Sequence, residues 1–112
     1  MNFIVKILLS SVGVLIVSYV LPGIDVQDFF TAVMIALVLA ILNYIVKPIL
    51  IILTLPVTIV TLGLFLLVIN ALIVLLASGM VDGFYVSGFW WALFFSLLLS
   101  LINGILFDLN KK

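Results

Sequence analysis

Long apolar stretches follow one another along this chain and are interrupted only by short segments with Pro, Gly or Asp. A helix that crosses the ~30 Å hydrocarbon core of a bilayer needs roughly 20 predominantly apolar residues. Four stretches approach this length, so the pattern predicts an all-α membrane protein with four transmembrane helices. They are predicted at about residues 3–21, 29–47, 57–78 and 89–107.

The first stretch starts like a signal peptide, because Lys6 precedes an apolar run. Large residues occupy positions 19–21, where signal peptidase would require small ones. We therefore expect an uncleaved first helix that ends before Pro22.

Two prolines interrupt the segment between the second and third helices. Pro48 has no amide hydrogen and disfavours helical geometry in Lys47, so we predict that the second helix ends there. A single helix over residues 48–81 would reach roughly 50 Å, too far for one crossing. Pro56 divides this length, and we predict a short helical or re-entrant connector over 48–56.

The two halves of the chain align after a shift of 60 positions. The same Gly, Phe, Ala and Asn positions recur without gaps in PGIDVQDFFTAVMIALVLAILNYI, from Pro22, and in DGFYVSGFWWALFFSLLLSLINGI, from Asp82. This indicates two duplicated helical hairpins, repeat 1 over about 1–47 and repeat 2 over about 57–112. Both repeats would begin on the same side of the membrane, so a pseudo-twofold axis along the membrane normal would relate them. We also expect their two short extended loops to pair outside the membrane.

Small residues recur at four-residue spacing on the second and fourth helices. They are Ala32, Ala36 and Ala40 in the first repeat and Ala92, Ser96 and Ser100 in the second. Such spacing lets helix backbones approach closely in lipid, where no hydrophobic effect drives helices together. We expect a tight contact between the second and fourth helices, with a homo-oligomer interface as the alternative use of these faces.

Three asparagines lie within the apolar stretches: Asn43, Asn70 and Asn103. A side-chain amide in lipid needs hydrogen-bond partners, which another helix can supply. For Asn43 and Asn103, the alternative is a polar lining of a cytoplasmic vestibule. Asn70 is predicted near the middle of the third helix, where a buried polar group is a candidate for a binding site or pathway.

Composition supports a membrane location. Hydrophobic residues make up 69% of the chain and charged residues 7%, with a mean hydropathy of +1.71, whereas a soluble domain carries about a quarter charged residues. With four helices, every lysine falls on one side and Asp25, Asp28 and Asp82 fall on the other. The positive-inside rule then predicts cytoplasmic termini in a bacterial inner membrane. The lysines are Lys6, Lys47, Lys111 and Lys112.

Several kinds of chemistry have no residues to support them. Cys and His are absent, which removes disulfides and the usual transition-metal ligands. No nucleophile–base pair or phosphate-binding loop occurs, so we expect no enzyme activity, cofactor or metal. The zero net charge without a basic patch argues against nucleic acid. The expected partners are the lipid bilayer and other copies of the chain, with a membrane protein or lipid ligand as the alternative.

A series of residues along the chain resembles a known family. It runs from Asn43-Tyr-Ile-Val-Lys47-Pro48 through Pro56, Thr61-Leu62-Gly63-Leu-Phe65 and Asn70-Ala71 to Gly88-Phe89, Ala92 and Ser100-Leu-Ile-Asn103. The series is similar to that of phage holin family 4, superfamily IV, which are small bacterial membrane proteins. The resemblance implies a four-span inner-membrane protein, and the holin label implies oligomers that permeabilise the cytoplasmic membrane. Asp28 departs from the family pattern, which has Gly before Phe in both loops.

Three functions remain open from the sequence. The leading hypothesis is a holin-like oligomer, favoured by the resemblance and the small-residue faces. The second is a structural or regulatory envelope protein that binds lipid or a membrane partner. The third is a small transporter or lipid-handling protein with Asn70 and the broken segment at its site.

Overall fold

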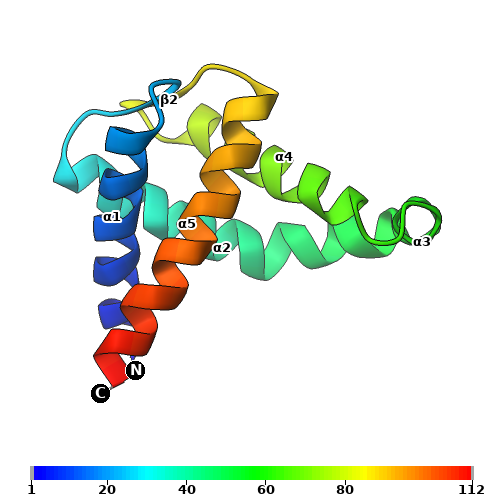
Figure 1. Ribbon diagram of the computed structural model, residues 1–112, viewed down its shortest axis with the longest axis horizontal. Coiled ribbons are helices and arrows are strands. Elements are labelled where there is room, and N and C mark those ends of the chain that lie inside the picture. Colours follow the sequence, from blue (N-terminus) through cyan, green and yellow to red (C-terminus); the bar gives the residue numbers. More distant parts are fainter. Residues whose placement is uncertain (1, 112) are drawn as a thin grey trace.

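Two pairs of helices diverge from a short β-ribbon in the computed structural model, which describes residues 2–111 (Figure 1). The elements are α1 (Phe3–Val20), β1 (Ile24–Val26), α2 (Phe29–Leu53), α3 (Leu55–Val60), α4 (Phe65–Met80), β2 (Phe84–Val86) and α5 (Phe89–Lys111). Helices α1 and α5 pack together as one arm, which we name the terminal arm because both chain ends lie at its tip. Helices α2 and α4 form the second arm, the central arm, with α3 at its tip.

Three of the helices are long and apolar enough to cross a membrane. They are α1, α2 and α5, and α4 is a shorter apolar helix of 16 residues. Local signals explain where α1 and α2 begin. The side chain of Asn2 accepts a hydrogen bond from the Val5 amide at 2.8 Å, and that of Asp28 accepts one from the Thr31 amide at 2.8 Å. Each side chain satisfies an amide that would otherwise lack a partner in the first turn of its helix.

The prediction that the second helix ends at Lys47 is wrong, because α2 continues through Pro48 to Leu53. Proline removes one bond of the helical ladder, and helices in lipid tolerate this loss when the surrounding groups remain hydrogen-bonded. At the end of α2 the Thr54 amide donates to the carbonyl of Leu50 at 3.0 Å. Most of the predicted connector over 48–56 is therefore an extension of α2.

The third helix starts later than the predicted residue 57. Pro56 lies in the first turn of the short α3, where its missing amide hydrogen costs little. The chain then turns at residues 61–64, with positive φ angles of 56° at Leu62 and 87° at Gly63. Thr61 Oγ1 accepts a hydrogen bond from the Phe65 amide at 3.2 Å. Because Gly63 tolerates the left-handed conformation, this turn separates α3 from α4.

The loops pair as expected, and this expectation is confirmed by the antiparallel ribbon. Ile24 pairs with Val86, Asp25 with Tyr85 and Val26 with Phe84. Two further bonds continue the ribbon: the Gln27 amide donates to the Gly83 carbonyl and the Ser87 amide to the Gly23 carbonyl, each at 2.9 Å. A shift of 60 residues relates Gln27 to Ser87 and Gly23 to Gly83. Each of the two bonds is therefore the equivalent of the other in the opposite loop.

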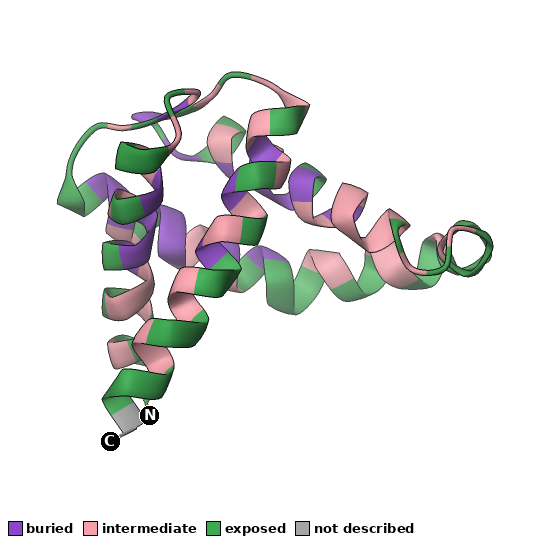
Figure 2. Cartoon of the chain, viewed as in Figure 1, coloured by how far each residue is buried: buried purple, intermediate pink, exposed green. Residues whose placement is uncertain are grey.

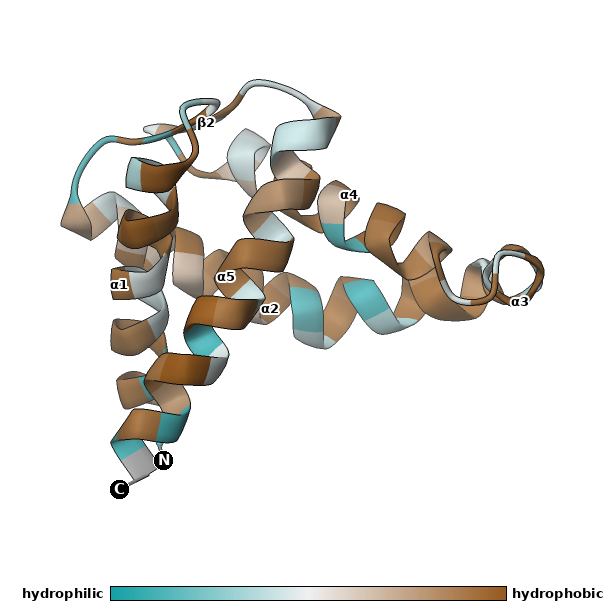
Figure 3. Cartoon of the chain, in the orientation of Figure 1, coloured by the Kyte–Doolittle hydropathy of each residue, from teal (hydrophilic) through white to brown (hydrophobic). Residues whose placement is uncertain are grey.

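The buried core lies where the helices cross, next to the ribbon (Figure 2). Its largest fully buried side chains include Phe84, Phe95, Ile35 and Ile69. The rings of Phe84 and Phe95 lie 5.4 Å apart, so the ribbon packs directly on α5. Large apolar side chains elsewhere along the helices are exposed, and Figure 3 shows that most turns of these helices consist of hydrophobic residues. Lipid can cover such surfaces, whereas water would not.

The predicted tight contact between the second and fourth transmembrane helices, α2 and α5, is wrong. The close backbone contacts of α2 are with α1 and α4, and those of α5 are with α4 and α1. Helices α2 and α5 instead face two common cavities, both of which are lined by Leu39 and Leu99. Of the six small residues, Ala32, Ala36 and Ala92 are buried, Ala40 and Ser96 are half-buried, and Ser100 is exposed.

Candidate functional site

Two neighbouring cavities separate the arms on the side away from the ribbon. One of about 220 Å³ lies between α1, α2 and α5, and one of about 70 Å³ lies between α2, α4 and α5. Leu39, Asn43 and Leu99 line both, so we describe the two cavities together as the notch. The polar residues that line the notch are Lys6, Ser10, Asn43, Lys47, Asn70, Ser96 and Asn103. Figure 3 shows hydrophilic bands on α2, α4 and α5, which are otherwise largely hydrophobic.

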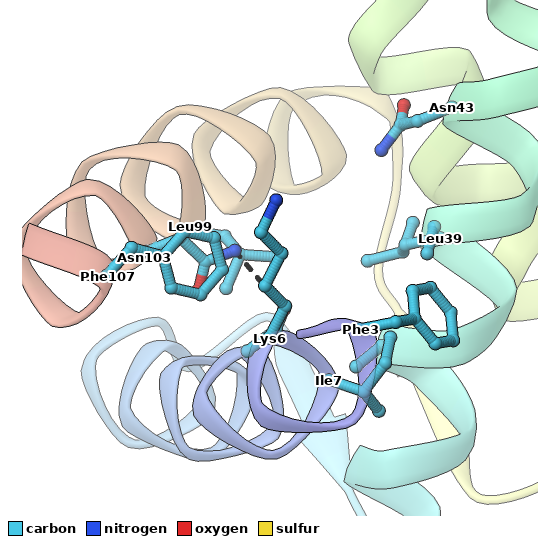
Figure 4. Close-up of a pocket in the computed structure, with 11 residues that line it drawn as sticks. Phe3, Lys6, Ile7, Leu39, Asn43, Leu99, Asn103 and Phe107 are labelled. Carbon is cyan, nitrogen blue, oxygen red and sulfur yellow. Dashed lines mark hydrogen bonds between the residues drawn. The ribbon is translucent and has the colours of Figure 1, made fainter. Parts of the chain in front are cut away.

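Asn103 bridges the two helices of the terminal arm. Its side-chain amide donates to Ser10 Oγ of α1 at 3.2 Å, as drawn in Figure 4. Its Oδ1 atom is buried and has no hydrogen-bond partner among the described residues. A Cβ atom at Gly13 would lie 2.8 Å from this oxygen. Glycine at position 13 therefore makes room for Asn103 against α1.

Asn43 has a different environment on the central arm. Its side chain is exposed and lines both cavities, and Figure 4 shows it on α2 opposite Lys6. A shift of 60 residues relates Asn43 to Asn103 and relates Gly13 to Ile73, which is buried beside Asn43 in the smaller cavity. Isoleucine at that position leaves no room for the close approach that Gly13 allows Asn103.

Asn70 is the sixth of the 16 residues of α4, close to the middle of that helix. Because α4 begins at Phe65, Asn70 falls in its second turn, nearer to α3 than the predicted span implied. It is half-buried and lines the smaller cavity together with Asn43 and Lys47. The structure therefore brings all three predicted asparagines to the walls of the notch.

Two lysines enter the notch from opposite arms. Lys6 belongs to α1 and Lys47 to α2, and the Lys6 side chain extends into the space between Asn43 and Asn103 (Figure 4). No carboxylate is among the residues that line either cavity. The notch is therefore positively charged and rich in hydrogen-bond donors, which suits an anion or water. Lys112 and the side chain of Lys111 lie outside the described residues.

Acidic residues occupy other surfaces. Asp25 and Asp28 line a separate cavity beside the ribbon, and Asp108 lines a shallow groove on α5. The hydrogen bond from the Thr31 amide holds the pKa of Asp28 below its ordinary value of 3.8. Among the residues described here, no three His, Cys, Asp or Glu side chains form a group that could hold a metal ion.

Sequence reasoning did not identify Lys6 and Ser10 as site residues. The repeat carried a usable signal, because adding 60 to Ser10 gives Asn70 and adding 60 to Asn43 gives Asn103. The polar positions of one half therefore match those of the other. Lys6 has no polar counterpart, since Leu66 occupies the equivalent position.

These features define a small helical membrane protein with a basic notch at one end. More specifically, the chain belongs to the family described as mycobacterial 4 TMS phage holin, superfamily IV, which matches residues 1–105. This match confirms the resemblance inferred from the Asn43-to-Asn103 series.

Two curated relatives cover nearly all of the chain. The uncharacterized membrane protein YvlD of Bacillus subtilis is 42% identical, over 96% of this chain and 96% of its own. The uncharacterized protein SCO3922 of Streptomyces coelicolor is 36% identical, over 94% of this chain and 92% of its own. No solved structure matches the chain.

Proposed function

We propose that this protein is a holin-like protein of the bacterial cytoplasmic membrane that self-associates and makes the membrane permeable by thinning it locally. The observation that carries the proposal is the short α4 beside a polar notch. The 16 residues of α4 span about 24 Å, less than the ~30 Å hydrocarbon core. A short span thins the surrounding bilayer or favours oligomers that share the mismatch.

The proposed topology consists of two duplicated hairpins, α1–α2 and α4–α5, related by a pseudo-twofold axis along the membrane normal. The reciprocal ribbon bonds between Gln27 and Gly83 and between Ser87 and Gly23 support this relation. The ribbon would lie outside the cytoplasm, and Lys6 and the termini would lie at the cytoplasmic face, in accord with the positive-inside rule.

Permeabilisation in this proposal requires several copies of the chain. The buried core, including Ile35, Ile69 and Phe95, fills the space between the notch and the ribbon. A single copy therefore has a notch on one side and a dry barrier on the other. Neighbouring copies would extend the thinned region until water crosses it.

The outer face of α5 is the proposed contact between copies. Ser100 and Gly104 are exposed at four-residue spacing and line a shallow groove. A Cβ atom at Gly104 would meet nothing within 4 Å, so the groove is open. Small residues in such a groove allow close packing of a second helix in lipid.

Dye leakage from vesicles, together with native mass spectrometry, tests the proposal. We expect the wild type to form oligomers and release dye, and Gly104→Leu to reduce both by about tenfold through loss of roughly 1–2 kcal/mol of helix contact. Gly79→Leu is the matched control, because a Cβ atom there also meets nothing within 4 Å but lies on α4. A monomeric wild type that releases no dye at high membrane density would rule out the holin-like function.

The notch favours a second candidate function, an envelope protein that binds lipid. Its specific support is the pair Lys6 and Lys47, which line the notch without a carboxylate among the lining residues. This function needs neither oligomers nor leakage, and neither candidate involves enzyme activity.

A further inference from the structure

We propose that the notch binds the phosphate group of an anionic phospholipid, with Lys6 and Lys47 holding the headgroup from opposite arms. The occupant is a lipid of the leaflet that the open end of the notch faces. The inference does not require self-association or leakage, so it can fail or succeed independently of the holin-like function.

Charge complementarity is the first argument. Lys6 and Lys47 line adjoining cavities, whereas Asp25 and Asp28 line a cavity near the ribbon and Asp108 lines a groove on the outer face of α5. Lys6 is exposed and Lys47 is half-buried, so both ammonium groups are accessible to a ligand of opposite charge. An anion in the notch would form charge-assisted hydrogen bonds with ammonium donors of both arms.

Hydrogen-bond donors in the notch provide the second argument. Ser10 Oγ accepts the bond from Asn103, so its own hydroxyl hydrogen remains available to a ligand. The exposed amide of Asn43 also faces the larger cavity. A phosphate group offers only acceptor oxygens and forms strong, charge-assisted bonds with ammonium donors. The donors of Lys6, Ser10, Asn43 and Lys47 match that requirement.

The apolar walls indicate a lipid rather than a free anion. Phe3, Ile7, Leu39, Leu99 and Phe107 line the larger cavity beside its polar groups. Its volume of about 220 Å³ is several times the ~30 Å³ share of one water molecule. A molecule with a phosphate next to a hydrocarbon segment can contact both parts of this lining. Inorganic phosphate would leave the aromatic and aliphatic wall without a partner.

Native mass spectrometry of the purified full chain tests the proposal with phosphatidylglycerol and phosphatidylcholine of identical acyl chains. We expect preferential retention of phosphatidylglycerol by about tenfold, because each lysine near the headgroups contributes to binding of anionic lipid. The double variant Lys6→Gln/Lys47→Gln should lose this preference, and Lys6→Arg/Lys47→Arg should keep it. Melting temperatures in detergent verify that each variant remains folded.

A third variant separates the notch from general electrostatic attraction. Lys6→Gln/Lys47→Gln/Asp108→Lys has the net charge of the wild type, but its added lysine lies on the outer face of α5. We expect it to behave like the double variant. Restored preference for phosphatidylglycerol would overturn the proposal, as would equal retention of both lipids by the wild type. The proposal that the bound phosphate belongs to a lipid would also be rejected if inorganic phosphate displaced phosphatidylglycerol and raised the melting temperature as much as the lipid does.

Discussion

The α1–α2 hairpin and the α4–α5 hairpin are alike near the ribbon and unlike at the notch. Near the ribbon, Ala32 and Ala92 occupy equivalent positions and both are fully buried. At the notch, Asn103 is bonded to Ser10 and packs against Gly13, whereas the equivalent Asn43 is exposed. The two hairpins therefore share a core and differ in the polar groups that they present.

This difference arises from side chains at positions that a shift of 60 residues relates. Gly13 allows α5 to bring Asn103 against α1, so the amide is used within the terminal arm. Ile73 occupies the corresponding position on α4, and the amide of Asn43 remains directed toward the notch. Lys6 and Lys47 add charge at positions whose equivalents are Leu66 and Phe107. One glycine and two lysines thus distinguish the two hairpins at the notch.

The largest effect is expected where the hairpins are most alike. Ala32→Leu and Ala92→Leu each add a bulky side chain at a fully buried position, which costs about 3 kcal/mol. Because the positions are equivalent, the two variants should lose similar amounts of stability in detergent, measured as melting temperature. Tolerance of one substitution but not the other would break the proposed equivalence of the hairpins.

Gly13→Ile should have the next largest effect, since it gives position 13 the side-chain type found at position 73. A Cβ atom at Gly13 already lies 3.2 Å from Leu99, in addition to its contact with Asn103. We expect a loss of about 2 kcal/mol and a wider terminal arm. Gly79→Ile is the control, because the space around Gly79 is open. Equal melting temperatures for the two variants would contradict the role assigned to Gly13.

The asparagines should differ by a smaller amount. Asn103→Ala removes the bond to Ser10 and should cost about 1 kcal/mol, within the range measured for hydrogen bonds between helices in membranes. Asn43→Ala removes an exposed side chain and should leave the melting temperature unchanged. A greater loss for Asn43→Ala would mean that this amide stabilises the fold, and the contrast between the hairpins would no longer hold.

Asp28→Gly should have the smallest effect on stability. It gives the start of α2 the residue found at the equivalent position before α5, which is Gly88. The pKa of Asp28 is lowered by its bond to the Thr31 amide, so the ionised carboxylate stabilises the folded state. This contribution is complete above the ordinary pKa of 3.8 and disappears as the pH falls through the lower folded-state value. Melting temperatures of the wild type and variant should therefore differ at neutral pH and converge in acid; a constant difference would exclude this role.

The pattern of apolar residues predicted the membrane class and the first helix well, because hydrophobicity and chain breaks act locally. It failed at Lys47, where the loss of one hydrogen bond at Pro48 was given too much weight. A helix in lipid retains its geometry because its other backbone groups have no water to bond with. The turn at residues 61–64 was also missed as the helix boundary, although Gly63 marks it.

The pairing of helices was beyond the reach of the sequence. Helices that are apolar on all sides carry no hydrophobic stripe that identifies the buried face. The spacing of Ala36 and Ser96 suggested a contact between α2 and α5, but these helices face two cavities lined by Leu39 and Leu99. The positions of Lys6 and Ser10 in the notch depend on the same packing.

By itself, the sequence determined that this protein is a helical membrane protein of the 4 TMS holin family, since composition, chain breaks and short motifs are properties of local segments. Only the tertiary structure decided which helices form the arms and which polar groups meet between them. The physical reason is that lipid accepts any apolar face equally, so side-chain shape selects the neighbours. At Gly13 that selection brings Asn103 to Ser10, and the space left between the arms becomes the notch.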